Sequence, residues 1–197
     1  MRLPLCVVLC FLAGDPKPTD KGKTDPPGVP LAALLTSKPA SYALDLGGKT
    51  ADEVRKQIDA GDYPAPPVVD LSLELRNSGD KDVLIRMGGT TTIIDLDLQG
   101  PAAVTVTLKG RVTNHLAIAP KTITLAPGKS QTVPINSLSF GFKGSHAAYW
   151  LAPGKYTLTA SYKTTVSPAP AKAVAADEGF GAVSIVSAPL TITVEGK

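Results

Sequence analysis

The stretch VVDLSLELRN, residues 68–77, decides the fold class of this chain. Positions 69, 71, 73 and 75 are apolar, and the positions between them are polar or charged. Because successive side chains of a β-strand point to opposite faces, this period of two predicts a strand with one buried face. The overlapping residues NSGD at 77–80 favour a turn, because they tolerate left-handed backbone or bond to their own backbone.

The same alternation recurs along the chain, loosely in one case, and predicts the other strands. The alternating stretches are 83–87, 92–98, 103–109, 118–125, 130–136, 156–162, 181–186 and 190–194. Their polar positions argue against a parallel α/β sheet, whose strands are continuous apolar runs. The 18 prolines argue against a helical bundle, because proline breaks helix interiors. We expect an all-β, antiparallel fold of about seven or eight strands over residues 67–197.

A short preface with one strand and one helix is predicted in residues 31–66. SYALDL at 41–46 alternates like a short strand. Thr50-Ala-Asp-Glu53 is a capping box, in which the Thr and Glu side chains satisfy each other's backbone N–H groups. It predicts a helix over 51–60, and Gly61 suits the left-handed residue that often ends a helix.

Residues 1–14 match the pattern of a secretory signal peptide. Arg2 is followed by a mostly apolar run at 3–12 and by the small residues Ala13 and Gly14. A secretory apolar region is about 7–15 residues long, whereas a membrane span needs about 20. We therefore expect no transmembrane span and export to the periplasm or the extracellular space.

Residues 15–30 are rich in proline, lysine and aspartate and predict a disordered tether. Both cysteines, Cys6 and Cys10, lie inside the predicted signal peptide, so the mature chain would have no thiol. Lipid anchoring through one of them is the alternative, although leucine precedes each, where a small residue is usual. The net charge of +3 is spread over scattered lysines, so nucleic acid is not an expected partner.

LAPGK occurs twice, at 125–129 and 151–155. Pro followed by Gly suits the centre of a type II turn, so we expect the same turn at both places. Residues 167–179 are rich in alanine and proline, and we expect a mobile loop there between two strands.

Several motifs resemble bacterial β-sandwich domains. The L-x-L-x-L-x-N-x-G pattern at 71–79 and APGKYTLTA at 152–160 resemble parts of bacterial immunoglobulin-like domains. In those domains the tyrosine of the second motif often forms a tyrosine corner, so the resemblance implies one at Tyr156. The order LELRNSGDKDV, TIIDLDL, LAPGKS, APGKYTLTA is similar to the BsuPI-type proteinase-inhibitor domain and to uncharacterised small secreted bacterial proteins. The resemblance implies an antiparallel immunoglobulin-like sandwich and, from the inhibitor family, binding to a proteinase.

Residues that could carry chemistry are few. His115 and His146 lie in separate segments without the spacing of a metal site. Ser145 precedes His146, but adjacent side chains rarely face each other, so no Ser–His hydrogen bond is expected. Asp95 and Asp97 lie on one strand face; calcium binding is open, and solvation of the outer face is the expected role.

Tyr149, Trp150 and His146 are the candidate binding residues. Exposed Tyr and Trp rings can stack on sugars, but a sandwich also needs a large core residue, and we expect Trp150 to be in the core. We predict no catalytic, metal-binding or cofactor-binding residue, and so no enzyme. The expected function is an exported protein-interaction or structural module whose partner is another protein or a cell-surface component. A BsuPI-like proteinase inhibitor and a carbohydrate-binding module are the alternatives, and the oligomeric state is open.

Overall fold

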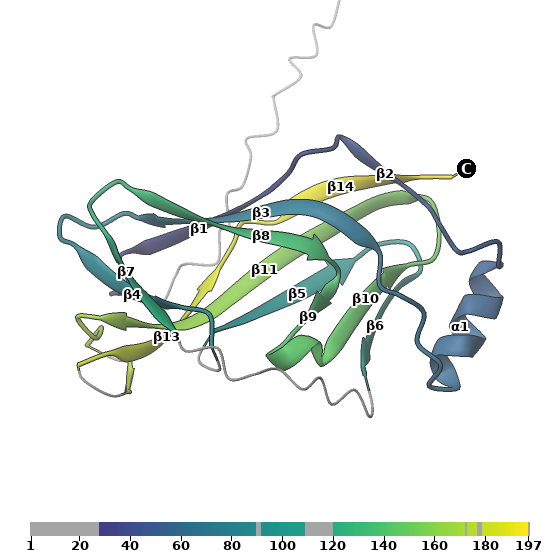
Figure 1. The fold of residues 1–197 in the computed structure, drawn as a ribbon. Helices are drawn as coiled ribbons and strands as arrows, with labels where there is room; N and C mark the ends of the chain where they lie inside the picture. Colours follow the sequence, from purple (N-terminus) through teal and green to yellow (C-terminus); the bar gives the residue numbers. More distant parts are fainter. Residues whose placement is uncertain (1–27, 90–91, 109–119, 172, 177–178, 197) are drawn as a thin grey trace, which may run out of the picture.

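The computed structural model describes residues 28–89, 92–108, 120–171, 173–176 and 179–196. Within them the chain is mostly β-strand, in three mostly antiparallel sheets that do not close, with one α-helix (Figure 1). The all-β class and the single helix are confirmed. The strands are β1 (Leu31–Ser37), β2 (Ser41–Ala43), β3 (Val68–Asn77), β4 (Val83–Met87), β5 (Ile93–Gln99), β6 (Ala103–Thr107), β7 (Lys121–Leu125), β8 (Ser130–Ser137), β9 (Ser139–Phe140), β10 (His146–Trp150), β11 (Gly154–Ser167), β12 (Val174–Ala175), β13 (Gly181–Val186) and β14 (Leu190–Glu195).

The largest sheet is built around β11, a strand of 14 residues. Along one edge β11 pairs first with β14 and then with β13, and along the other edge first with β5 and then with β4. β12, β7 and β2 extend this sheet beside β13, β4 and β14, and only the β2–β14 pair is parallel. The two smaller sheets have the orders β1-β3-β8 and β6-β10-β9.

The β1-β3-β8 sheet lies over the β11 sheet, and the two share one hydrophobic core (Figure 1). Leu73 and Leu75 of β3 and Leu158 of β11 are fully buried, as their alternation predicts. Burying a leucine side chain contributes about 1.5–3 kcal/mol, so these facing rows are a main source of stability.

Asn77 links the two loops that connect these sheets. One loop joins β3 to β4, and the other joins β7 to β8. The buried Asn77 amide Nδ2 donates to the carbonyls of Lys81 (2.8 Å) and Leu125 (2.7 Å), while its Oδ1 accepts from the N–H of Gly79 (2.9 Å). Its backbone also exchanges hydrogen bonds with the turn at Gly128 and Lys129.

The two LAPGK sequences form different turns, which corrects the expectation of one shared turn. At the first, Gly128 has a φ of 71° and the N–H of Lys129 donates to the Ala126 carbonyl at 3.0 Å, as in a type II turn. At the second, Gly154 has a φ of 147°, far from the type II value, and already belongs to β11. A Cβ at Gly154 would lie 2.9 Å from the Pro101 ring, so close packing requires this glycine.

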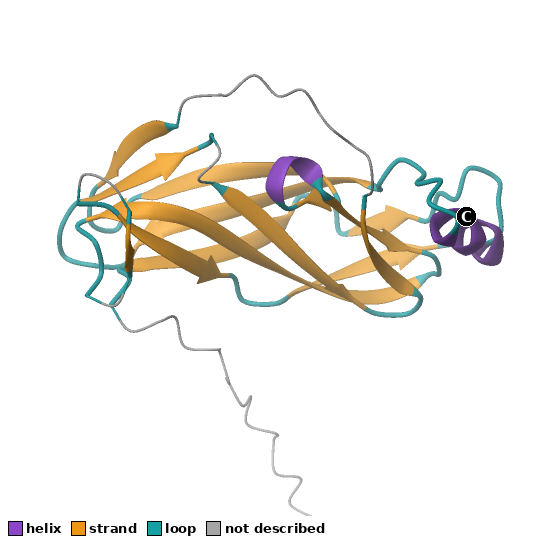
Figure 2. Ribbon diagram, turned by 90° about the horizontal axis from the view of Figure 1, so that it is seen from below, coloured by secondary structure: helices purple, strands orange, loops and turns teal. Residues whose placement is uncertain are grey.

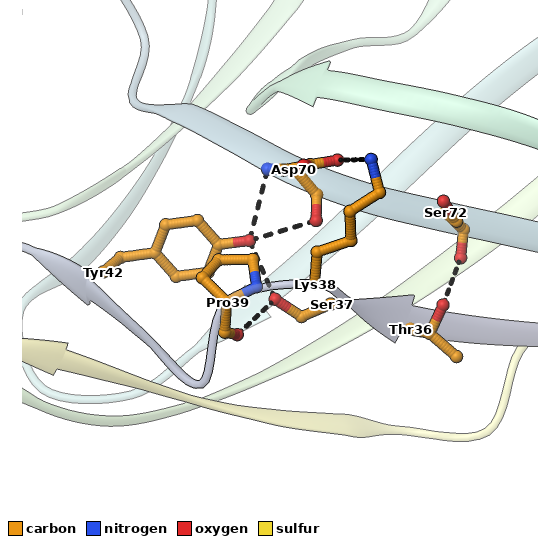
Figure 3. Close-up of polar contacts among 7 residues, drawn as sticks. All are labelled: Thr36, Ser37, Lys38, Pro39, Tyr42, Asp70 and Ser72. Atoms are coloured by element: carbon orange, nitrogen blue, oxygen red, sulfur yellow. Dashed lines mark hydrogen bonds and ion pairs between the residues drawn. The ribbon is translucent and has the colours of Figure 1, made fainter.

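The 31–66 segment, predicted to have one strand, has two, and both pair with strands of the body. β1, which the sequence does not reveal, pairs with β3, and β2 covers only the first half of the predicted 41–46 strand and pairs with β14. The turn between them is tied to β3 (Figure 3). There the Tyr42 hydroxyl accepts from the Asp70 N–H at 3.2 Å and lies 2.9 Å from Ser37 Oγ, and Lys38 pairs with Asp70 at 3.1 Å.

The helix α1 (Ala51–Asp59) lies at one end of the molecule, clear of the long strands (Figure 2). Its predicted capping box is confirmed, because the Thr50 hydroxyl accepts from the Glu53 N–H and the Glu53 carboxylate accepts from the Thr50 N–H. Gly61 has the predicted left-handed backbone, with a φ of 83°.

Other predictions meet the structure in part. The 167–179 segment, expected to be a loop, contains β12, which pairs with β13. The predicted signal peptide with both cysteines, nearly all of the 15–30 tether and His115 lie outside the described residues. In the part of the chain that the structure describes, no helix has the length and apolarity to cross a bilayer.

Candidate functional site

β10 is buried on both faces, which explains why it lacks the alternation of the other strands. Ala148 and Trp150 face the main core. Ala147, Tyr149 and Leu151 face a second hydrophobic cluster, completed by residues that include Val54 and Ile58 of α1 and Leu108. The helix therefore covers the outer side of β10. Because both faces of the strand are buried, the run AAYWL at 147–151 is apolar at every position.

A hydrogen bond holds the chain after α1 against β10. The Tyr149 hydroxyl donates to the Pro64 carbonyl at 2.8 Å, across 85 positions of sequence. Pro64, Pro66 and Pro67 restrict the backbone between α1 and β3, because each proline fixes its own φ. The segment thus forms a stiff wall at a defined distance from β10.

A cleft of about 590 Å³ opens between this wall, the loop before α1, the helix and the end of β10. Its volume lies within the range of about 300–1,000 Å³ that is usual for ligand pockets. Most of its lining is apolar. The lining residues are Ala43, Asp45, Leu46, Gly47, Lys49, Val54, Gln57, Pro64, Ala65, Pro66, Pro67, Val68, Tyr149, Trp150 and Leu151.

Three polar side chains of the cleft are paired within α1 and the loops beside it. Lys49 Nζ donates to Gln57 Oε1, and Gln57 Nε2 donates to Asp62 at 2.9 Å. Asp45 accepts from the N–H of Gly47 at 2.9 Å. Beside these side chains, hydrogen bonds from the Thr50 backbone and then from its hydroxyl lower the pKa of the Glu53 carboxyl.

Tyr156 lies next to Trp150 and forms the predicted tyrosine corner. Its buried ring is 6.1 Å from the Trp150 ring, and its hydroxyl donates toward the carbonyls of Ala152, at 2.7 Å, and Pro101. Gly100 makes room for the ring, since a Cβ there would lie 2.5 Å from it. Burial raises the pKa of the Tyr156 phenol above its ordinary value.

The candidate residues Tyr149, Trp150 and His146 do not form one site. Tyr149 and Trp150 both line the cleft but are only 3% and 4% exposed, so neither ring offers a face on which a sugar could stack. The expectation that Trp150 belongs to the core is confirmed. His146 begins β10, whereas Trp150 ends it, and His146 does not line the cleft.

The expectation that Ser145 and His146 do not hydrogen bond is wrong. Ser145 Oγ lies 2.8 Å from His146 Nδ1, and the His146 ring stacks on Phe140 with centroids 5.6 Å apart. Gly141 permits this arrangement, because a Cβ there would lie 2.5 Å from the His146 ring. No carboxylate within the described residues hydrogen bonds to His146, so the pair lacks the group that orients the base in a hydrolytic triad.

Asp95 and Asp97 point away from the core, as predicted, while Leu96 between them is buried. Asp95 pairs with Lys163 of β11 at 2.6 Å, and Asp97 accepts from Gln99 at 2.8 Å. Across the described ranges, no three His, Cys, Asp or Glu side chains are grouped so that they could hold a metal ion.

Sequence reasoning missed most of the cleft. Lys49, Gln57 and the wall from Pro64 to Val68 gave no motif, because they come together only when α1 docks on β10. The one available signal was the non-alternating run at 147–151, which is typical of a strand covered on both sides.

No model of a known protein family matches this chain, and no curated protein matches its sequence. Within the described residues the chain is a mostly β-strand protein with several sheets and one short helix.

Proposed function

We propose that this chain is a non-catalytic binding module with an immunoglobulin-like β-sandwich body, and that it takes an extended segment of a partner protein in the cleft between α1 and β10. The observation that carries this proposal is the cleft itself, with its apolar lining and its stiff proline wall. A cleft of this kind can bind by burying apolar side chains, and a preformed wall lowers the entropic cost of binding.

Two features support the sandwich. The β1-β3-β8 sheet and the β11 sheet share one core, and Tyr156 makes the corner that many such domains contain. A strand edge is a less suitable binding surface than the cleft, at least along β8. Pro134 lies in the middle of β8, opposite Ser72, and a proline has no N–H to offer an added strand.

Two exposed valines provide a matched test of the cleft. Val68, at the rim, is 81% exposed, and Val174, on β12 and outside the cleft lining, is 77% exposed. Substituting either by aspartate changes an exposed side chain and is expected to alter the free energy of unfolding by less than about 0.5 kcal/mol.

The experiment selects short random peptides against the full chain and measures their affinities by calorimetry. We expect selected peptides to lose at least about tenfold in affinity for Val68→Asp, because a carboxylate at the rim costs desolvation, and to bind Val174→Asp as they bind the wild type. Failure to select any binder, or equal binding to all three proteins, contradicts the proposal.

The inhibitor alternative is tested in parallel. Steady-state assays of serine, cysteine and metalloproteases with the wild type and both variants are expected to show no inhibition. Inhibition that survives Val68→Asp would place the activity outside the cleft and favour the inhibitor function instead.

A further inference from the structure

Trp150 provides a hydrogen-bond donor that the fold leaves unused. Its indole N–H makes no hydrogen bond to any of the described residues. Within those residues the one fully buried side-chain polar atom without a partner is Thr165 Oγ1, so the indole N–H is not sealed in the core but meets solvent. Trp150 is only 4% exposed, and its ring packs between the Tyr42 and Tyr156 rings, so we expect the indole to have little freedom to move.

We propose that the Trp150 indole N–H points into the cleft and binds a backbone carbonyl oxygen of an extended peptide that also places an apolar side chain against the proline wall. This inference rests on the proposed function and names the chemistry of its ligand. Indole N–H is a donor only, so its partner must be an acceptor. A rigid donor costs little entropy on binding, which makes it a good determinant of orientation.

The charge of the lining favours a neutral ligand. Asp45 and Lys49 are the charged lining residues, and they have opposite signs, so they give the cleft no net charge. A peptide carbonyl flanked by an apolar side chain meets both requirements of the cleft: an acceptor for the indole and apolar surface for Pro66, Pro67 and Val68. A sugar would need an open aromatic face, which the buried Trp150 ring does not offer.

The chain contains a single Trp, so its indole gives one cross-peak in a proton–nitrogen correlation spectrum. The probe is N-acetyl-L-leucinamide, a small molecule with both a peptide carbonyl and a leucine side chain. N-acetylglycinamide, which keeps the carbonyls and lacks the side chain, is the matched control probe. Both are titrated into the full-length wild type, Val68→Asp and Val174→Asp.

We expect the leucine probe to move the indole proton saturably to higher chemical shift in the wild type and in Val174→Asp. The glycine probe and the Val68→Asp variant are expected to give little or no shift. Trp150→Phe keeps an aromatic ring but removes the donor, and it should weaken the selected peptides by roughly three- to tenfold, the value of one neutral hydrogen bond.

The outcomes separate this inference from the proposed function. If selected peptides bind in a manner sensitive to Val68→Asp while the indole cross-peak does not move, the cleft binds peptides and the role of Trp150 is wrong. If neither peptides nor probe bind, both proposals fall. Should Trp150→Phe lower the melting temperature too far for binding assays, the indole cross-peak of the wild type decides the question.

Discussion

At the residue scale, two buried side chains, Asn77 and Tyr156, hydrogen bond to backbone carbonyls at the ends of strands and in loops. The Asn77 amide donates to two backbone carbonyls and accepts from one N–H, and the single hydroxyl proton of Tyr156 is shared between the carbonyls of Ala152 and Pro101. A buried polar group that loses its partner costs its desolvation free energy. A change at either position that keeps the volume but alters the hydrogen bonding should therefore lower the free energy of unfolding.

Asn77→Asp is expected to lower the free energy of unfolding by at least about 3 kcal/mol, because an acceptor and a charge would face the carbonyls of Lys81 and Leu125. Chemical denaturation measures the loss. Asn136→Asp makes the same change at an exposed position of β8 and should stay within about 0.5 kcal/mol of the wild type. A small loss at both positions would mean that the Asn77 hydrogen bonds contribute nothing to stability.

Tyr156→Phe should keep the fold and cost about 0.5–1.5 kcal/mol, towards the upper end because two carbonyls lose their donor. Tyr156→Ala adds a cavity and should cost about 3–5 kcal/mol in the same denaturation experiment. Tyr63→Phe is the control, since within the described residues the Tyr63 hydroxyl has no hydrogen bond. Equal losses for the two Phe variants would contradict the corner.

At the element scale, α1 depends on its cap and on β10. The helix has nine residues, too short to be stable alone in water. Val54 and Ile58 supply its buried face against β10, and the capping box satisfies its first N–H groups. The helix and the cleft that it borders should therefore form and melt together.

The capping box makes α1 sensitive to acid. Since the folded-state pKa of Glu53 is lowered, its stabilising effect is complete above the ordinary glutamate pKa of about 4.3 and is lost as the pH falls through the lower folded value. An NMR titration should therefore place the Glu53 midpoint below that of an unstructured glutamate. Thr50→Ala should raise the midpoint part of the way, because the backbone hydrogen bond survives; an unchanged midpoint would exclude the hydroxyl as a cause.

At the scale of the whole molecule, β11 is the strand to which the other parts attach. Its two edges together hold four strands, and its inner face shares the core with β3. The residue that bridges the gap between β13 and β14 is Ser187, which exchanges hydrogen bonds with Ala160 of β11. The described residues contain no cysteine, so the body that carries α1 and the cleft is held together by strand pairing and by its hydrophobic core.

Export concerns the whole chain. Full-length protein produced in a bacterial host with a secretion system is expected to yield a mature form that starts near Asp15 and has no thiol, because residues 3–12 match a secretory apolar region. Intact-mass spectrometry with a thiol-reactive label measures both properties. A secreted form that retains Met1 or reacts with the label would contradict the prediction.

The sequence by itself determined what depends on a few neighbouring residues. The period of two located β3, β4 and β13, and Thr50 with Glu53 located the start of α1, because strand orientation and helix capping involve residues only two or three positions apart. Only the tertiary structure decided the two-sided burial of β10, the pairing of β1 with β3 and the cleft. Those features depend on which distant segment covers a strand. Tyr149 meets Pro64, 85 positions earlier in the chain, only because the strands between them pair into sheets that bring β10 beside the chain after α1.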